Sequence, residues 1–554
     1  MENRRFILIA LLGVVLFFLY QSWQKDYGNQ PPSAPVAQTA QTPNAQTAAT
    51  AETAAVADAA STGGTEAAPA IPAQRIRVET DVYIAEIVTL GGELRRLELK
   101  QYPATKDKPE PMSLLDDRND RLFVLQSGLA GTDRPYATDK TPYTAAQTDY
   151  KLAEGRDALD VTLSYTGADG IEVQKTYEFR RDSYQIKLSQ TLKNTGAAEL
   201  TVSPYTRLVR TDYKPDGEPR FSHTFLGVGF YQQEGAGGTS YKFKKTTLDK
   251  LAKDGFDTQQ TGGWITILQH YFAAAIVPPH DEQVTYSAKP REAGGYRAQA
   301  IGAGVAVAAG AEHRFDTQLY IGPKLQDRID DVAPGFELTL DYGILKIIAR
   351  PMFAVLKFFH TWTGNWGVAI ILLTISVKLA LFKLSEAQYR SMAKMKVFGP
   401  KIQDIRERYA DDRERQQKAM MDLYKKEGFN PLAGCWPILV QFPIFISLYW
   451  VLLESVELRQ APFMLWLQDL SAPDPFYVLP VIYGITMFLQ QRMSGNTTMD
   501  PTQQKVMQVM PIGMTAFFAF FQSGLVLYWA VNGLISIAQQ WIITRRLTAE
   551  GLKR

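Results

Sequence analysis

A single basic residue inside an otherwise apolar segment constrains this chain more than any other feature. The segment from Asn365 to Phe382 has the length and composition of a membrane-spanning helix, and Lys378 lies within it. At a helical rise of ~1.5 Å per residue, Lys378 lies roughly 18 Å from Trp366 and about 6 Å from Phe382. A charge at that depth costs about 2.5–3.5 kcal/mol, so Lys378 is a candidate functional residue. A lysine whose amine extends to the nearer membrane surface is the alternative interpretation.

The composition excludes several classes of protein. The 59 Lys and Arg are balanced by 57 Asp and Glu, and basic residues cluster only beside apolar segments, so nothing indicates nucleic-acid binding. The single cysteine, Cys435, excludes an internal disulfide, and the five histidines form no i, i+4 pair of a zinc site. Neither a Gly-rich phosphate loop nor a GxSxG motif is present. We therefore expect no metal, no cofactor and no enzymatic activity.

The N-terminal region predicts a membrane anchor followed by a linker. An apolar run from Phe6 to Tyr20 follows Arg4 and Arg5, which places the N-terminus in the cytoplasm. No small-residue cleavage site follows the run, so we predict an uncleaved signal anchor over residues 1–24. Residues 25–73 are rich in Ala, Thr, Gln and Pro and nearly free of bulky apolar side chains, which is typical of a flexible linker.

Residues 74–336 have the pattern of a large all-β domain. Apolar side chains alternate at period two from Leu159 to Tyr165 and again from Ile171 to Phe179, which predicts the two strands of a hairpin. Clusters of Gly and Asn mark turns between such segments. We predict a periplasmic sandwich of two antiparallel sheets with a docking or spacing role. No paired-carboxylate or histidine site can be identified, which disfavours catalysis in this domain.

The segment 337–363 predicts an amphipathic helix. Four basic residues fall within an arc of about 80° at about 100° per residue, and apolar residues fill the other face. They are Lys346, Arg350, Lys357 and His360. Because the segment directly precedes a membrane run, we predict a helix in the outer membrane interface. An ordinary amphipathic helix packed on the β domain is the alternative.

The remaining chain predicts a helical membrane core over residues 364–547, followed by a short basic tail at 548–554. Together with the anchor, five apolar runs make six spans with both termini in the cytoplasm. Twelve Lys or Arg and eight Asp or Glu in 383–429 predict a cytoplasmic helical hairpin. Several runs are short for a hydrocarbon core of ~30 Å, so they would thin the bilayer around them. The five core spans are 365–382, 431–453, 476–491, 506–521 and 525–543.

Polar residues within the spans form faces at helical spacing. Thr374 lies one turn before Lys378, and Gln441 is isolated in its span. The last span carries a longer polar face, formed by Asn532, Ser536, Gln539 and Gln540. The usual role of such residues is to hydrogen-bond one helix to another. Because no carboxylate lies within the last five runs to neutralise Lys378, a water-filled recess on the cytoplasmic side suits this cation better than a sealed bundle.

A stripe of Met507, Met510 and Met514 at i, i+3, i+7 continues into Phe517 and Phe518. Core packing is the commoner explanation for such a stripe. Flexible methionine and flat phenylalanine surfaces also suit the binding of many different apolar segments.

Four stretches of the core resemble the YidC/Oxa/Alb family of membrane protein insertases in its Gram-negative form. They are NWGVAIILLTISVKLALFKLSEAQYRSMAKM, NPLAGCWPILVQFPIFISLYW, VELRQAPFMLWLQDLSAPDPFYVLP and QSGLVLYW. The resemblance is close from Phe336 to Leu547, and the anchor and β domain match that form in layout. It implies an insertase and chaperone for nascent inner-membrane proteins. Such a protein works alone or with the Sec translocon and its accessory subunits, through a hydrophilic groove open to the cytoplasm and to lipid.

The resemblance also implies roles for particular residues. Lys378 would be the groove cation that attracts the polar or acidic tail of a client protein, with Thr374 as its polar companion. The apolar part of the client would slide out along a surface that includes Phe442, Phe445, Phe517 and Phe518. We add Gln441, Trp529 and Asn532 to these candidate substrate-binding residues. Many relatives have Arg where this chain has Lys378, and Trp529 stands where a tyrosine is expected.

Further parts of the chain receive roles from the same resemblance. The β domain resembles a β-supersandwich and is expected to touch the Sec machinery, and the cytoplasmic hairpin is expected to receive clients. Ribosome binding through the short C-terminal tail is expected to be weak.

Two other classes of function remain as alternatives. A small-solute transporter or channel with Lys378 as an anion site predicts broken helices and internal repeats, which the sequence does not show clearly. A membrane-tethered carbohydrate enzyme or binder would need the spans only as an anchor. Five further spans and a charged residue within the membrane exceed that need.

Overall fold

The fold is described from a computed structural model of the 554-residue chain. It describes residues 73–549 apart from 107, 119, 132–133, 168–169, 216–224, 235–239, 254, 411, 427–435 and 495–500. The predicted anchor at 1–24, the linker as far as residue 72 and Cys435 lie outside the described residues, as does the end of the predicted tail.

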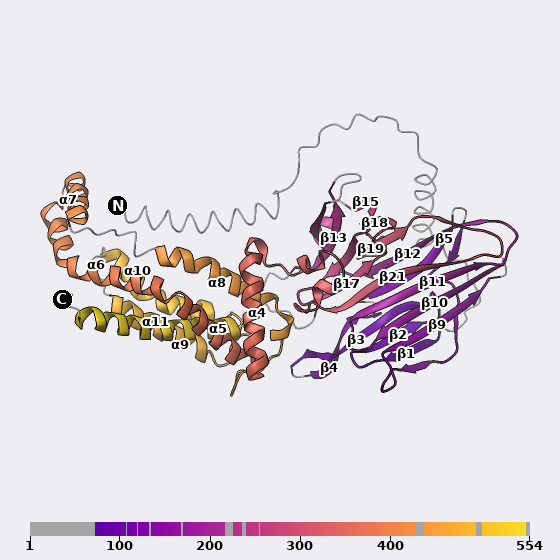
Figure 1. Cartoon of the computed structure of the whole chain (residues 1–554), viewed down its shortest axis with the longest axis horizontal. Coiled ribbons are helices and arrows are strands. Elements are labelled where there is room, and N and C mark those ends of the chain that lie inside the picture. Colours follow the sequence, from indigo (N-terminus) through magenta and orange to yellow (C-terminus); the bar gives the residue numbers. More distant parts are fainter. Residues whose placement is uncertain are drawn as a thin grey trace, which may run out of the picture. The chain divides into compact units, whose positions relative to one another are not determined.

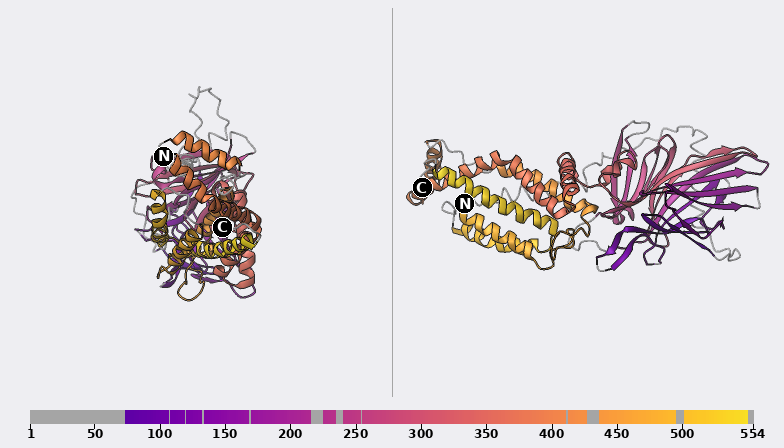
Figure 2. Two further views of the ribbon diagram at one scale, coloured as in Figure 1. Left: turned by 90° about the vertical axis from the view of Figure 1, so that its left-hand side faces the viewer. Right: turned by 60° about the horizontal axis from the view of Figure 1, so that its bottom comes forward.

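The first half of the described chain forms two β-sheets (Figures 1 and 2). One sheet has 12 strands, in the order β15-β18-β19-β12-β5-β3-β2-β1-β8 with β20, β4 and β6 attached at its sides. Its strands are β1 (Arg75–Glu79), β2 (Tyr83–Val88), β3 (Glu93–Thr105), β4 (Lys108–Leu115), β5 (Phe123–Gly131), β6 (Pro135–Ala137), β8 (Asp149–Lys151), β12 (Leu200–Arg210), β15 (Phe256–Thr261), β18 (Gln283–Pro290), β19 (Tyr296–Gly302) and β20 (Val305–Val307).

The second sheet has nine strands in the order β14-β13-β16-β17-β21-β11-β10-β9-β7. Its strands are β7 (Thr144–Ala145), β9 (Ala158–Thr166), β10 (Ile171–Arg180), β11 (Gln185–Asn194), β13 (Gly227–Gln233), β14 (Tyr241–Thr247), β16 (Trp264–Leu268), β17 (Phe272–Val277) and β21 (Glu312–Pro323). A short helix, α3 (Leu248–Leu251), follows β14. The predicted sandwich of mostly antiparallel sheets is therefore confirmed, and β1 with β8 is a parallel pair within it.

Period-two alternation produces the core between the sheets. In β10, every second side chain from Ile171 to Phe179 is buried, because successive strand residues point to opposite faces. The predicted hairpin is confirmed, with Tyr165 opposite Val173 and Leu159 opposite Phe179. One member of this buried face is polar: the amine of Lys175 donates to the carbonyls of Gly91 and Ser127, and burial lowers its pKa to about 7.

The second half of the described chain is helical (Figure 1). Three short 3-10 turns lead into it, at Ile329–Asp331, Phe336–Thr339 and Gly343–Leu345. The helices are α4 (Lys346–Thr363), α5 (Trp366–Ala380), α6 (Phe382–Arg408), α7 (Arg413–Lys426), α8 (Trp436–Glu454), α9 (Val478–Ser494), α10 (Pro501–Phe518) and α11 (Ser523–Ala549), and a 3-10 turn at Val456–Leu458 follows α8.

Helix α5 ends earlier than the predicted span. It stops at Ala380, and α6 departs from it by 64° across Leu381. The cap side chain of Asn365 accepts a hydrogen bond from the amide of Val368, which fixes where α5 begins. Neither Gly nor Pro marks the bend at Leu381, so the sequence carries no local signal for it.

Few of the described helices are long and apolar enough to cross a membrane by themselves. Among the described helices, Ser523–Leu547 of α11 is the one that meets this condition by itself. Helix α5 and the start of α6 meet it together, as a bent pair. Leu439–Glu454 and Val506–Phe518 are apolar but shorter. The polar residues at the start of α10, before Val506, keep its apolar part short. The count of six spans thus stays a prediction.

Helix α4 presents three different faces. Its basic residues pair with acidic residues that follow the last strand: Lys346 with Glu337 at 3.1 Å, and Lys357 with Asp327 at 2.6 Å. A second face, with Ala349, Met352, Phe353 and Leu356, is buried. A third face is apolar and exposed, and it includes Ile347, Val355, Phe358 and Trp362. Within the predicted segment 337–363 the helix covers Lys346–Thr363, three residues of its basic arc form ion pairs within the chain, and its place in the membrane interface stays a prediction.

Candidate functional site

The amine of Lys378 is turned into the helical core. The residue is 6% exposed, and its Nζ donates a 2.8 Å hydrogen bond to Oγ of Ser536 on α11. Ser536 in turn donates to the carbonyl of Asn532 at 2.7 Å. This geometry differs from that of a lysine reaching for the membrane surface, because the side chain crosses to a neighbouring helix.

No acidic partner neutralises Lys378 within the described residues. The only polar contact of its ammonium there is the hydroxyl of Ser536, which accepts a hydrogen bond from one of the three ammonium N–H groups. The predicted companion Thr374 is 1% exposed and lies one turn away, but its hydroxyl donates to the carbonyl of Ile370 in its own helix. Lys378 therefore keeps donor capacity and charge for a further partner.

Further polar groups, from α11 itself and from two other helices, α6 and α8, lie around this pair. Nε2 of Gln539 lies 3.5 Å from the carbonyl of Lys378, and its buried Oε1 has no hydrogen-bond partner among the described residues. On α8, Nε2 of Gln441 lies 3.4 Å from Oδ1 of Asn532. The predicted polar face of α11 thus meets both α5 and α8. Tyr389 of α6 joins it through a 3.3 Å hydrogen bond from its hydroxyl to the carbonyl of Ser536.

Aromatic side chains from four helices form a cluster on α11 two turns before Ser536. Trp529 lies at its centre, with ring centroids 4.3 Å from Phe445, 5.2 Å from Phe518 and 5.4 Å from Tyr483. Buried Nε1 of Trp529 has no hydrogen-bond partner in the part of the chain that the structure describes. A client would have to open this cluster to touch Phe518, which is 4% exposed.

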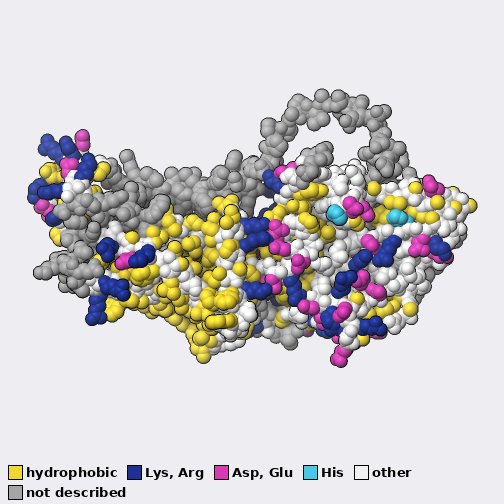
Figure 3. All heavy atoms as spheres, viewed as in Figure 1, with side chains coloured by type: hydrophobic (Ala, Val, Ile, Leu, Met, Phe, Trp, Pro, Cys, Tyr) yellow, Lys and Arg dark blue, Asp and Glu magenta, His cyan; other side chains and the backbone are white. Residues whose placement is uncertain are grey.

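The other two predicted sliding residues lie on the surface. Phe517 is 54% exposed on α10 and Phe442 is 39% exposed on α8. An apolar depression of about 520 Å³ on α10 continues this surface toward the start of that helix. Two residues of the predicted methionine stripe, Met510 and Met514, line it. On the face seen in Figure 3, the helical part of the chain shows mostly hydrophobic side chains, with Lys and Arg gathered toward its ends.

A further buried lysine, Lys324, lies just after β21, beside the C-terminal end of α8. Lys324 and Glu454 form a 3.2 Å ion pair with both side chains buried. Nε2 of His270 lies 2.9 Å from the carbonyl of Leu453, and burial lowers the pKa of this histidine. The carboxylate of Glu457 accepts a hydrogen bond from the amide of Gln326, and burial raises its pKa to about 7.

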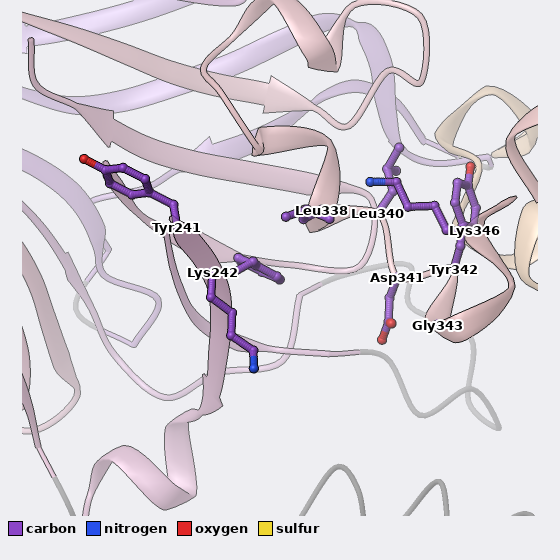
Figure 4. Close-up of a pocket in the computed structure, with 9 residues that line it drawn as sticks. Tyr241, Lys242, Leu338, Leu340, Asp341, Tyr342, Gly343 and Lys346 are labelled. Atoms are coloured by element: carbon purple, nitrogen blue, oxygen red, sulfur yellow. The ribbon is translucent and has the colours of Figure 1, made fainter. Parts of the chain in front are cut away.

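The same junction borders a pocket of about 320 Å³ (Figure 4). Its walls come from β14 and from the segment that leads into α4, and include Tyr241, Lys242, Asp341 and Lys346. Asp341 pairs with Lys245 at 2.5 Å, and Lys346 pairs with Glu337. Because these charges are largely neutralised inside the chain, this pocket lacks the unneutralised charge of the Lys378 site.

The described residues hold no cluster of His, Cys, Asp or Glu able to bind a metal ion. A buried ammonium with spare donors, polar amides and hydroxyls around it, and an apolar surface on adjacent helices can bind an anionic or polar group without covalent chemistry. These features define a protein with an apolar helical part, a buried polar cluster around Lys378 inside it, and a β-sandwich domain that precedes it in the sequence.

Comparison with known proteins assigns the family. Residues 358–550 match the protein family described as "60Kd inner membrane protein", and residues 75–355 match the family described as "YidC periplasmic domain". A membrane protein insertase YidC of Nitrosococcus oceani is 42% identical over 100% of both chains, and one of Methylococcus capsulatus is 43% identical over 99% of both. The chain belongs to the YidC family of membrane protein insertases. It is thus an inner-membrane protein with a periplasmic domain, and not an enzyme.

A solved structure of an active YidC insertase, with its first transmembrane domain resolved, is 19% identical to this chain. It covers 84% of this chain and 93% of its own length, with a TM-score of 0.36. The family assignment depends on the sequence matches and not on this likeness.

Proposed function

We propose that Lys378 is the binding centre of a hydrophilic groove that receives the polar tail of a nascent inner-membrane protein. The observation that supports this most directly is a buried ammonium whose only partner among the described residues is the hydroxyl of Ser536. Lys175 of the β domain is also buried without an ion pair, but its amine donates to two carbonyls, whereas the Lys378 ammonium has a single hydroxyl partner, and an unneutralised buried charge is costly. A charge kept without an acidic partner is available for a client.

The groove lowers the cost of moving a polar tail across lipid. Every charge and peptide group of the tail loses its hydration in hydrocarbon. A hydrated recess around Lys378 and Gln539 carries the tail part of the way, and short spans thin the remaining bilayer. The membrane potential adds about 2.3 kcal/mol per charge per 100 mV, which favours outward movement of acidic tails. No nucleotide is needed for this cycle.

The apolar segment of the client leaves along the exposed surface of α8 and α10. Phe442, Phe517 and the depression beside Met510 and Met514 offer that surface directly. Phe445, Phe518 and Trp529 contribute from inside the aromatic cluster. Gln441 and Asn532, which face one another, connect the polar and apolar parts of the path.

The proposed topology has six spans with both termini in the cytoplasm. The anchor at 1–24 and the linker at 25–73 precede the periplasmic domain at 74–336, and the interfacial helix at 337–363 leads into the core at 364–547. Helices α6 and α7 form a cytoplasmic hairpin that receives clients, and the tail at 548–554 contacts the ribosome only weakly. Twelve basic residues in 383–429 support the cytoplasmic placement. The Sec translocon is a proposed partner through the periplasmic domain.

The test is insertion of a short single-span client into liposomes that contain only the purified full-length protein. We expect insertion without ATP, and we expect Lys378→Glu to reduce insertion of an acidic-tailed client at least tenfold more than that of a neutral-tailed one. Lys378→Arg is the matched control and retains insertion. Equal insertion of both clients by the wild type and by Lys378→Glu would remove Lys378 from the mechanism. The transporter alternative is not supported by the family to which the chain belongs.

A further inference from the structure

The loop between α8 and α9 has both of its carboxylates turned inward and several large apolar side chains on its surface. Between Gln460 and Tyr477 the only charged residues are Asp469 and Asp474, and both point into the loop. Four large apolar or aromatic side chains are exposed, Met464 at 50%, Leu465 at 74%, Phe476 at 68% and Tyr477 at 52%, and one polar side chain, Gln468, is exposed beside the tip. A loop in water would be expected to have the opposite arrangement.

A tight hairpin forms the tip of this loop. Met464 and Leu467 form an antiparallel bridge, the amide of Phe463 donates to the carbonyl of Leu467, and the amide of Leu467 donates to the carbonyl of Met464. Leu465 is thus the first central residue of a turn, and its φ is +53°. Glycine is the usual residue at such a position, and a side chain there costs on the order of 1 kcal/mol.

Neither the backbone nor contact with water explains a leucine at the tip. Its backbone angle favours glycine, and its side chain has no cover within the described residues. An apolar environment outside the chain accounts for it, because burying a leucine side chain there contributes about 1.5–3 kcal/mol.

The hairpin cannot collapse to hide this side chain, because its base is fixed to the core. Asp474 is 1% exposed and accepts hydrogen bonds from Nε1 of Trp466 at 2.9 Å and from the amide of Leu479 at 2.7 Å. On the other side, Nδ2 of Asn365 donates to the carbonyl of Phe463 at 2.8 Å. A Cβ on Gly367 would lie 2.1 Å from the ring of Phe463, so this approach requires glycine.

The exposed apolar surface of the loop continues into surfaces that face lipid in the proposed topology. Along α9, Tyr477, Val481, Ile485 and Phe488 are all exposed and recur at helical spacing. At its base, the hairpin meets the start of α5, two residues after α4 ends with its exposed Trp362. A lipid bilayer fits this continuity better than a protein partner, which would cover a bounded patch.

We propose that the hairpin Phe463–Leu467 inserts its tip, Met464 and Leu465, into the acyl-chain region of the outer leaflet. The loop between α8 and α9 is then a rigid wedge in the membrane and not an aqueous connection. It fixes how deeply the first residues of α5 and of α9 lie in the membrane, and it occupies volume in the outer leaflet beside the helical core. This inference concerns membrane placement and does not depend on the role of Lys378.

The experiment places a fluorescent nitrobenzoxadiazole label at single cysteines in the full-length Cys435→Ser protein, reconstituted in phosphatidylcholine–phosphatidylglycerol vesicles. Labels at Leu465→Cys, at Val481→Cys in α9 and at Glu312→Cys in the β domain are compared. Lipids with a nitroxide near the carbonyl end of the acyl chain serve as quenchers. We expect quenching at 465 comparable to that at 481, with a blue-shifted emission, and at least threefold weaker quenching at 312.

Two results would overturn the inference. If the label at 465 is quenched as weakly as the label at 312, the tip lies in water and not in the acyl chains. A protein partner would then have to be the occupant. A label at 465 that is shielded from the nitroxide lipids at high protein-to-lipid ratio, and exposed to water on dilution, would make a second copy of the chain the occupant. A further variant, Leu465→Asp, is expected to reduce quenching of a label at Met464→Cys at least twofold.

Discussion

Two of the buried lysines, Lys324 and Lys378, have opposite surroundings. Lys324 has a carboxylate at 3.2 Å, from Glu454, and donates to the carbonyl of Thr339 as well. Lys378 is as buried, yet within the described residues it contacts only the hydroxyl of Ser536. A paired charge holds two parts of a fold together, whereas an unneutralised charge is maintained at a cost to stability. The difference indicates that Lys324 serves structure and Lys378 serves binding.

The largest expected effect concerns the paired lysine. Lys324→Ala leaves Glu454 buried without its cation, so we expect a loss of about 3–5 kcal/mol in the free energy of unfolding. The double variant Lys324→Met/Glu454→Leu should recover most of that loss, because it removes both charges. Thermal unfolding of the purified full-length protein measures this. The exposed pair Arg408–Asp404 is the control, with an expected cost below about 1 kcal/mol. If Lys324→Ala lowers the free energy of unfolding no more than the control does, the Lys324–Glu454 pair does not hold the β domain and the helical core together.

The unneutralised lysine should show the reverse pattern. Lys378→Met removes a costly charge and one hydrogen bond, so we expect thermal stability to change by less than about 1 kcal/mol. Insertion of an acidic-tailed client into liposomes should fall about tenfold, or about 1.4 kcal/mol. If Lys378→Met unfolds the protein as Lys324→Ala does, the distinction between the two lysines disappears.

Ser536 should have a smaller effect through Lys378. The Ser536→Ala variant frees the ammonium from its one described partner, and we expect a two- to fivefold decrease in insertion of acidic-tailed clients with unchanged insertion of neutral-tailed ones. Ser536→Thr keeps the hydroxyl and should restore the wild-type ratio. A decrease shared equally by both clients would indicate a packing role for Ser536 instead.

The last prediction concerns the pH dependence of stability at the junction around Lys324. Burial lowers the pKa of His270, so its unfolded form binds the proton more readily and stability is lost as pH falls below 6.5. Burial raises the pKa of Glu457 from 4.5 to about 7, so stability is lost as pH rises through that interval. His270→Gln should remove the acid-side loss and Glu457→Gln the loss at higher pH. Thermal midpoints measured across this range check both signs.

The parts of the fold that could be predicted from sequence are those with a local pattern. Period-two alternation predicted the hairpin of β9 and β10, and helical spacing predicted that Asn532 and Ser536 share a face. The bend at Leu381 has no such signal, because the residues that form it are ordinary helix formers. Sequence showed that Lys378 lacks an acidic neighbour in its own span, but it could not show which helix the amine approaches.

Contacts between distant residues account for what sequence reasoning missed. Lys324 and Glu454 are separated by 130 residues, and nothing in either segment marks the other as its partner. Tyr389 reaches the carbonyl of Ser536 only because α6 returns beside α11. The outward tip at Leu465 was also missed. The low number of basic residues in this loop indicates an external loop, but nothing in its sequence shows which way its apolar side chains point.

Accessibility at position 378 tests the central proposal most directly. In inverted inner-membrane vesicles that carry the full-length Cys435→Ser protein, Lys378→Cys should react with a membrane-impermeant maleimide from the cytoplasmic side. An arrested acidic-tailed client should block that reaction, while Leu373→Cys, buried on the same helix, should stay unreactive in either case. Equal inertness of both cysteines, or labelling at 378 that the client leaves unchanged, would contradict a hydrated client-binding groove at Lys378.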